Sequence, residues 1–105
     1  MQFTSFLENG KLTVALTGEI DHHCAKHYIQ AITAKIEAYT PDACILDFEE
    51  VSFVDSSGIA VVINALRAMA QIEGTLLLTG IHAQPMRVFQ ASGIDKLVQI
   101  KEVAV

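Results

Sequence analysis

Residues 51–66 read VSFVDSSGIAVVINAL, and this stretch predicts a bend followed by a helix. An apolar strand over 43–48 precedes it, and two acidic residues separate that strand from the bend. The helix begins at Asp55, Ser56 and Ser57, which all belong to the residue types that cap helix N-termini. One helix start needs one capping oxygen, so a hydroxyl is left over at the positive end of the helix dipole, where a phosphate group is tolerated. A serine switch and a well-capped helix are therefore both open interpretations.

The N-terminal region predicts a β-hairpin. Residues 2–7 and 11–17 contain mainly residues that favour strands, and Asn9-Gly10 lies between them. A two-residue type I′ turn needs positive φ at both central positions, which Asn and Gly accept. Gly18 is expected to end the second strand.

A long helix is predicted over 22–39, with Asp21 as its N-cap. Its apolar residues recur at helical spacing and predict one buried stripe: Ala25, Ile29, Ile32, Ile36 and Tyr39. Pro41 ends this helix, because a proline disfavours helical backbone in the residue before it. The next strand, 43–48, contains few polar residues, as expected for a strand that is covered on both faces.

The rest of the chain alternates between helices and strands. We expect a helix over 57–72, a strand over 75–79, a short helix over 83–91 and a last strand over 97–100. The first of these helices should bury Ile59, Val62, Ile63, Leu66 and Ala70. Pro85 is tolerated in the first turn of the short helix, and Ser92-Gly93 ends it.

The order of these elements predicts an α/β fold in a single domain over residues 1–105. A mixed β-sheet opens with the N-terminal hairpin and continues through parallel βαβ crossovers, with about three helices packed against it.

Composition and charge exclude several classes of function. The 105 residues are 51% hydrophobic and 18% charged, and seven Lys and Arg against twelve Asp and Glu give a net charge of −5. An acidic chain without a basic cluster does not fit nucleic acid or an anionic membrane as its main partner. We see no signal peptide and no apolar run that spans a bilayer, so we expect no membrane insertion and a cytoplasmic protein. Cys24 and Cys44 are too few for a disulfide framework and are expected to be buried thiols.

Catalytic chemistry has little support in the sequence. Possible metal ligands gather at the start of the first predicted helix: His22, His23, Cys24 and His27. A C-x-x-C motif and a second ligand pair are absent, so we expect no physiological metal. Ser56 lacks the G-x-S-x-G context of a hydrolase nucleophile, and the chain has no P-loop and no dinucleotide fingerprint. We therefore expect no enzymatic activity and no cofactor, with a small serine- or metal-dependent hydrolase as the alternative of that class.

Two segments carry a resemblance to a known family, GEIDHH at 18–23 and SFVDSSGI at 52–59. They resemble the anti-sigma factor antagonists of bacteria, which are single-domain members of the STAS family, and in particular the sporulation type. Gly74-Thr75 and Ser92-Gly93-Ile94 are also similar to the family, so the resemblance extends over nearly the whole chain. It implies a STAS-like fold and a regulatory role in transcription.

The resemblance implies a partner-switching mechanism. The unmodified protein binds an anti-sigma factor that is also a serine kinase and carries ATP or ADP, and this binding releases a sigma factor for sporulation or a stress response. The kinase then phosphorylates the antagonist, the complex separates, and a phosphatase resets the system. The alternative within the family is a STAS subunit of a transport complex or of a stress-sensing scaffold. Such relatives often lack the phosphorylatable serine, which this chain keeps.

The motif match also implies roles for individual residues. Ser56 takes the place of the phosphorylated serine, and Asp21 matches an acidic position that faces the kinase. Asp55, Ser57 and Gly58 shape the loop and helix start that present Ser56 to the partner. We expect the free protein to be a monomer. Family members usually carry a further helix after the last strand, whereas only residues 101–105 follow it here, so either that helix is absent or the chain is a truncated form or a variant. Less complete cover of apolar surface would then favour self-association.

Overall fold

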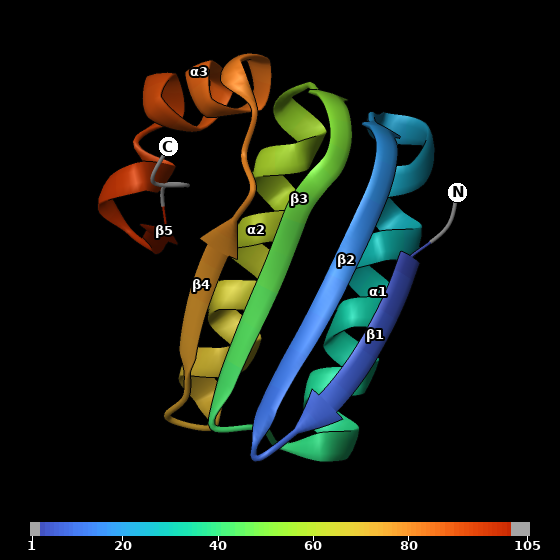
Figure 1. Ribbon diagram of the computed structural model, residues 1–105, viewed down its shortest axis with the longest axis vertical. Helices are drawn as coiled ribbons and strands as arrows, with labels where there is room; N and C mark the ends of the chain where they lie inside the picture. Colours follow the sequence, from blue (N-terminus) through green and yellow to red (C-terminus); the bar gives the residue numbers. More distant parts are fainter. Residues whose placement is uncertain (1–2, 102–105) are drawn as a thin grey trace.

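The structure is a computed structural model that describes residues 3–101 and has the predicted α/β architecture (Figure 1). Its five-stranded sheet has the order β1-β2-β3-β4-β5. The strands are Phe3–Glu8, Lys11–Ile20, Ala43–Val54, Thr75–Thr79 and Gln99–Lys101. β1 is antiparallel to β2, and the other neighbours are parallel. Helices α1 (His22–Tyr39), α2 (Ser56–Gln71) and α3 (Ala83–Ser92) lie between strands in the chain, so the predicted hairpin and crossovers are confirmed.

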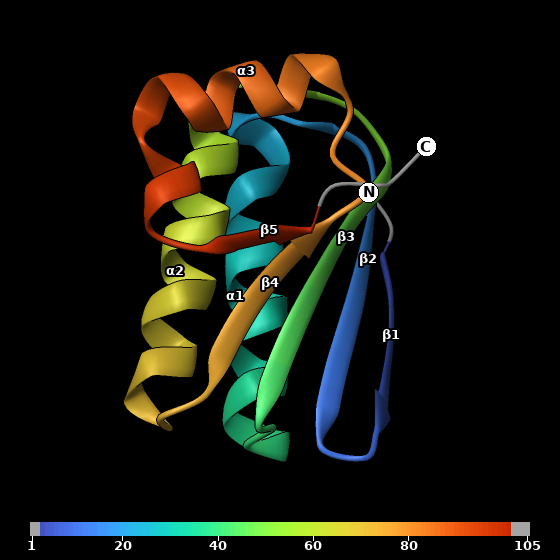
Figure 2. The same cartoon turned by 60° about the vertical axis from the view of Figure 1, so that its left-hand side comes forward.

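Helices α1 and α2 cover one face of the sheet, and α3 lies across the end at which β2 and β3 finish (Figure 2). Side chains alternate along a strand, so every second residue enters the core between sheet and helices. On the three central strands these buried residues are Leu12, Val14, Leu16, Cys44, Leu46, Phe48, Leu76 and Leu78. No helix within residues 3–101 is long and apolar enough to cross a membrane.

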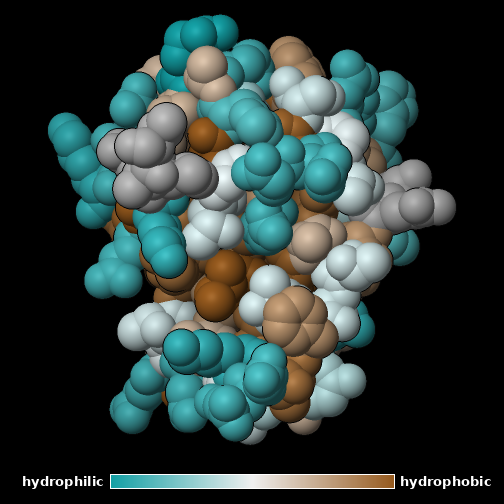
Figure 3. All heavy atoms as spheres, viewed as in Figure 1, coloured by the Kyte–Doolittle hydropathy of each residue, from teal (hydrophilic) through white to brown (hydrophobic). Residues whose placement is uncertain are grey.

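Among residues 3–101, no helix lies over the opposite face of the sheet (Figure 1). The expectation that β3 is covered on both faces is therefore wrong. Ile45 is only partly buried there, and it pairs in register with Leu77, which is also partly buried. Figure 3 shows hydrophobic side chains in the middle of this face with polar ones around them. The cross-strand contact between apolar neighbours explains how β3 keeps its apolar sequence without a second layer of helices.

The hairpin forms where the sequence predicts it. Asn9 and Gly10 have φ angles of 51° and 78°, and β1 and β2 pair from Glu8↔Lys11 outward. The expected end of β2 at Gly18 is wrong, because the strand continues to Ile20. Gly18 has a φ of 79°, and the register to β3 shifts directly after it. The glycine thus permits an irregularity of the kind found at β-bulges, and the strand goes on beyond it.

Helix α1 has the predicted bounds and the predicted N-cap, Asp21. The predicted stripe is partly correct, since Ala25, Ile32 and Ile36 are buried. Tyr39, however, is 49% exposed, and the fully buried aromatic residue of this helix is Tyr28. The Tyr28 hydroxyl donates to the carbonyl oxygen of Thr17 at 3.1 Å, which satisfies its polar end inside the fold.

Strand β3 is longer than predicted, because it continues through the acidic pair Glu49-Glu50 to Val54. Both glutamates are exposed, whereas Val51 and Val54 are fully buried. β2 accompanies the extension, with shifts in register that accommodate it. The extension carries the chain directly to Asp55, so the start of α2 lies at the very end of the sheet.

Helix α2 begins at Ser56, one residue earlier than expected, and its buried face is rotated from the predicted one. The fully or largely buried residues are Gly58, Val61, Val62, Ala65, Ala68 and Met69. Ala70 is exposed, whereas Ile59, Ile63 and Leu66 pack against the core from its margin.

The C-terminal elements follow the predicted order. β4 has the predicted bounds, and α3 ends at Ser92 with Gly93 as its C-cap, whose φ is 84°. A 3₁₀ turn, Ile94–Lys96, was not predicted. It delays β5 to residue 99 and leaves Leu97 62% exposed.

Candidate partner-binding site

The predicted site residues lie at the end of the sheet where β2 and β3 finish and α1 and α2 begin (Figure 2). Ile20 and Val54, the last residues of these strands, are partners in register. Asp21 and Asp55 follow them directly, and the Asp55 N–H donates to the Ile20 carbonyl oxygen at 3.2 Å. The carboxyl ends of adjacent parallel strands meet at one edge of a sheet. The fold thus brings the DHH and DSSG segments side by side.

Asp55 supplies the capping oxygen of α2. Its Oδ1 accepts a hydrogen bond from the Ser57 N–H at 2.7 Å, and its backbone is extended. The helix start therefore does not depend on the hydroxyl of Ser56, whose side chain is exposed in the first turn. Ser57 is half-buried and contributes the N–H that Asp55 caps. The folded molecule thus agrees with the sequence, in that the cap of α2 does not use the Ser56 hydroxyl.

Gly58 allows the first turn of α2 to lie directly on β3. The residue is buried, and a Cβ atom in its place would lie 2.9 Å from the Cβ of Val54 and 3.3 Å from its Cγ1. A real Cβ does not approach a neighbour so closely, so a side chain here would push the helix start away from the strand. Ser56 is two residues before Gly58 in the same helical turn, so this contact also fixes the position of the serine relative to the end of β3.

Asp21 caps α1 in the same way, and it lies on the same surface as Asp55. Its Oδ1 accepts from the His23 N–H at 2.9 Å, and its Oδ2 lies 3.6 Å from His23 Nδ1. Desolvation is the largest single influence on the pKa of this carboxyl and raises it, but the hydrogen bond from the His23 backbone and the charge of the His23 ring together outweigh it and lower the pKa. Asp21 therefore carries its negative charge throughout the neutral range.

Exposed carboxylates and one aromatic ring lie on the two strands that lead to this helix start. Glu19, Glu49 and Glu50 are exposed, and Phe53, which is 39% exposed, pairs in register with Glu19. The N-termini of α1 and α2 add the positive ends of two helix dipoles. Such a surface, with charge and an apolar ring together, has the composition of a protein–protein interface rather than of an enclosed catalytic cleft.

Gln84 joins this region from a distant part of the sequence. Its Oε1 accepts from the Val54 N–H, and its Nε2 donates to the Val54 carbonyl oxygen, both at 2.9 Å. His82 also reaches β3, with Nε2 at 2.8 Å from the carbonyl oxygen of Glu49. The sequence analysis missed Gln84, because a glutamine in the first turn of a helix carries no signal of a bond to a strand thirty positions earlier.

The histidines at the start of α1 do not converge on one point. The rings of His22 and His23 lie against each other with centroids 4.0 Å apart, and His23 faces Asp21. His27 instead lies beside the rings of Phe3 and Tyr28. Within residues 3–101, no group of three or more His, Cys, Asp or Glu side chains is arranged to hold a metal ion.

Both cysteines are free and buried, as predicted. Burial raises the pKa of the Cys44 thiol to about 12, so this group stays neutral and unreactive in the core. The Cys24 thiol donates to the carbonyl oxygen of Glu19 at 3.3 Å.

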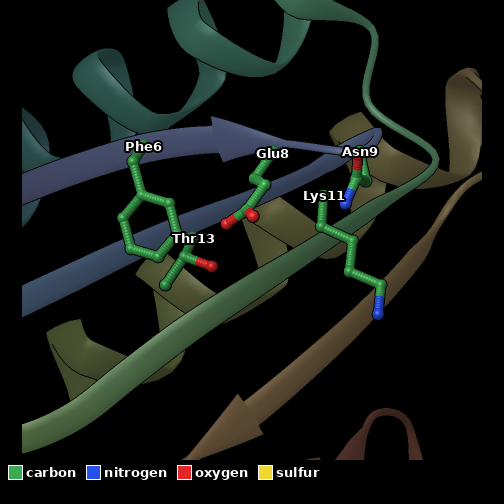
Figure 4. Close-up of a pocket in the computed structure, with 5 residues that line it drawn as sticks. All are labelled: Phe6, Glu8, Asn9, Lys11 and Thr13. Atoms are coloured by element: carbon green, nitrogen blue, oxygen red, sulfur yellow. The ribbon is translucent and has the colours of Figure 1, made fainter.

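An open hollow on the uncovered face of the sheet lies beside the hairpin (Figure 4). Its lining residues are Phe6, Glu8, Asn9, Lys11 and Thr13. The hollow lies where β2 begins, whereas Asp21 follows the end of the same strand. None of the predicted site residues lines it.

Comparisons with known proteins agree with this geometry. The family model described as STAS domain matches residues 7–104. An anti-sigma F factor antagonist of Lysinibacillus sphaericus is 32% identical over 83 residues, which are 79% of this chain and 71% of the relative. An anti-sigma-B factor antagonist of Listeria monocytogenes is 30% identical over 95 residues, or 88% of this chain and 80% of the relative. Among solved structures, the phosphorylated form of the Bacillus cell fate determinant SpoIIAA is similar, with a TM-score of 0.76 and 26% identity over 98% of this chain and 92% of that one.

Proposed function

Because the chain belongs to the STAS domain family, we propose that it is an anti-sigma factor antagonist whose binding state is set by phosphorylation of Ser56. One observation carries this proposal: Ser56 is exposed at the first turn of α2, while Asp55 alone supplies the capping oxygen. The serine is therefore available for modification without loss of the cap. The names of the relatives, which include anti-sigma F and anti-sigma-B factor antagonists, support a regulatory function rather than a catalytic one.

The proposed cycle has two partners. The unmodified protein binds an anti-sigma factor that is also a serine kinase, and the sigma factor leaves that kinase. Ser56 Oγ then attacks the γ-phosphorus of ATP held by the kinase, the bond to ADP breaks, and the hydroxyl proton leaves to the kinase. A protein phosphatase hydrolyses the phosphoserine and restores the binding form. This chain needs no cofactor of its own, because the kinase holds the nucleotide.

The phosphate acts locally. It adds about −1.5 to −2 charges, and the dipole of α2 favours an anion at this position, so the domain stays folded. Inside an interface the same charge is desolvated and lies close to the carboxylates of Asp21 and Asp55 and to the phosphates of the nucleotide. A change from almost fully bound to almost fully free requires about 5.5 kcal/mol of differential affinity. A buried phosphate without a partner can supply a free energy of that order.

Each residue of the site has a distinct part in this proposal. Ser56 accepts the phosphate, and Asp55, Ser57 and Gly58 hold the helix start that presents it. Asp21 adds a carboxylate to the same surface, where it faces the kinase. We further propose that residues 1–105 form a single domain that is a monomer when free. Its partners regulate transcription, so we place the protein in the cytoplasm.

A pair of baits tests the proposal. Ser56→Ala keeps the shape and charge of the unmodified form. Ser56→Asp places a negative charge at the same residue and so imitates phosphoserine. Ser52→Asp is the matched control, because Ser52 is also exposed and precedes the site on β3. We expect the alanine bait and the Ser52→Asp bait to capture an anti-sigma factor kinase from the native cytoplasm, and the Ser56→Asp bait to lose it. Equal capture of a transporter or scaffold subunit by all three baits would contradict the switch.

A further inference from the structure

The end of β3 has a strand neighbour on one side only. β4 pairs with β3 from Ala43 to Asp47 and stops there, whereas β2 pairs with it as far as Val54. Residues 48–54 therefore extend past β4, and the end of β3 lies beside the start of α3 (Figure 1). Backbone N–H and C=O groups on that side need other partners, because an unpaired buried polar group is costly.

The carboxamide of Gln84 takes the place of the missing strand at the last position. It accepts from the N–H of Val54 and donates to the carbonyl oxygen of the same residue, both at 2.9 Å, as a neighbouring strand would. His82 binds the carbonyl oxygen of Glu49 at 2.8 Å farther back on the same edge. The first turn of α3 is thus fastened to the extension of β3 at two points.

Val54 transmits this restraint to the phosphorylation site. Its side chain is fully buried and lies against Gly58 in the first turn of α2. Its carbonyl carbon is bonded to Asp55, whose N–H is held by Ile20 and whose carboxylate caps the helix. Gln84 holds the backbone of Val54, and Val54 is followed directly by Asp55 and Ser56. Gln84 therefore restrains the backbone from which the Ser56 side chain projects.

We propose that Gln84 is a positioning residue for Ser56, so that α3 holds the phosphoacceptor in the geometry that the kinase requires. This inference rests on the proposed function. Without the carboxamide, both backbone groups of Val54 turn to water and the segment 53–57 gains freedom. Transfer of a phosphoryl group depends on an aligned nucleophile, so the rate of the chemical step falls even though the docking surface is intact.

Three variants separate positioning from a merely structural role. Gln84→Met has a similar length and shape but neither hydrogen bond. Gln84→Glu keeps an acceptor for the Val54 N–H and loses the donor, so it should recover part of the function. Gln90→Met makes the same substitution at an exposed position of the same helix and serves as the control.

The assay measures phosphorylation of Ser56 by the kinase that the Ser56→Ala bait captures, at varied concentrations of the protein. For Gln84→Met we expect kcat to fall about tenfold, which corresponds to about 1.4 kcal/mol, with KM unchanged. Gln84→Glu should lie between that value and the wild type, and Gln90→Met should match the wild type. In Gln84→Met, amide hydrogen exchange should be faster at Val54 and unchanged for the core amides of α1, and NMR relaxation should give lower order parameters over 53–57.

The outcomes distinguish this inference from the function on which it rests. A wild-type protein that the kinase phosphorylates, together with a Gln84→Met variant of equal kcat, would overturn the positioning role and leave the switch intact. A wild-type protein that carries no phosphate at Ser56 would contradict the proposed function. In that case the NMR measurement decides alone, and unchanged order over 53–57 in Gln84→Met would overturn the positioning role.

Discussion

Gly58 lies so close to Val54 that a Cβ atom on the glycine would be 2.9 Å from the Cβ of the valine. Helix propensity alone predicts that alanine at a helical position stabilises a protein by about 1 kcal/mol relative to glycine. Overpacking of a filled core costs about 1–3 kcal/mol. The contact therefore opposes the propensity, and the sign of the measured effect shows which one dominates.

We expect Gly58→Ala to lower the free energy of unfolding by about 1 kcal/mol, because the added methyl group forces α2 away from β3. Urea unfolding followed by circular dichroism measures this change. An increase in stability would show that the first turn of α2 has room for a side chain, and the account of how Ser56 is held would then be wrong.

Two variants of Asp55 separate the hydrogen bond that caps α2 from the negative charge of the carboxylate. Asp55→Ala should cost about 1 kcal/mol of stability, because the Ser57 N–H loses the acceptor at 2.7 Å. Asp55→Asn keeps an acceptor oxygen and should cost only a few tenths of a kcal/mol. Ser57→Ala should be nearly neutral, since its N–H rather than its hydroxyl takes part in the cap. A loss in Ser57→Ala as large as that in Asp55→Ala would contradict the assignment of the capping residue.

Stability should depend on the ionisation of Asp21 in acid. The pKa of its carboxyl is lower in the folded protein than the ordinary value of 3.8, because desolvation, which raises it, is outweighed by the hydrogen bond from the His23 backbone together with the charge of the His23 ring. A lowered pKa means that the stabilising contribution is complete above 3.8 and is lost as the pH falls through the lower, folded value.

Carbon-detected NMR titration of the Asp21 carboxyl measures this pKa directly, and Asp21→Asn should remove the corresponding part of the acid-induced loss of stability. A measured pKa at or above 3.8 would show that the cap of α1 does not favour the charged form.

The two thiols should be protected in the native state. Cys44 is fully buried with its pKa raised to about 12, and Cys24 is 8% exposed. We therefore expect Ellman's reagent to react with neither cysteine in the folded protein at mildly alkaline pH and with both in concentrated guanidinium chloride. Rapid reaction of Cys44 in native buffer would mean that the sheet opens on the side covered by α1 and α2.

Local sequence signals predicted those parts of the fold that local chemistry controls. Asn9-Gly10 forms a turn with two positive φ angles, as this dipeptide favours between two strands, and Asp21 caps the helix that directly follows it. Gly18 misled the prediction, because a glycine with a φ of 79° suits an irregular strand as well as a strand end. The acidic pair Glu49-Glu50 was expected to follow the end of β3, but it lies in the part of this strand that β4 does not accompany, and both side chains are exposed.

In the candidate site, too, local sequence signals did not predict contacts between distant elements. The adjacency of Asp21 and Asp55 follows once two parallel strands are known to be neighbours, and the motif itself draws attention to Ser56. Gln84 could not be found in this way. Its role arises because β4 is shorter than β3, and no residue near Gln84 in the sequence reports the length of a strand elsewhere.

The affinity of the captured kinase for the two forms of this protein tests the central claim most directly. We would titrate the kinase, loaded with ADP, with unmodified protein and with protein phosphorylated at Ser56, and measure both dissociation constants by calorimetry. The account predicts that phosphorylation weakens binding by on the order of 10³- to 10⁴-fold, with no change in the far-UV circular dichroism of the protein. Equal dissociation constants for the two forms would contradict it.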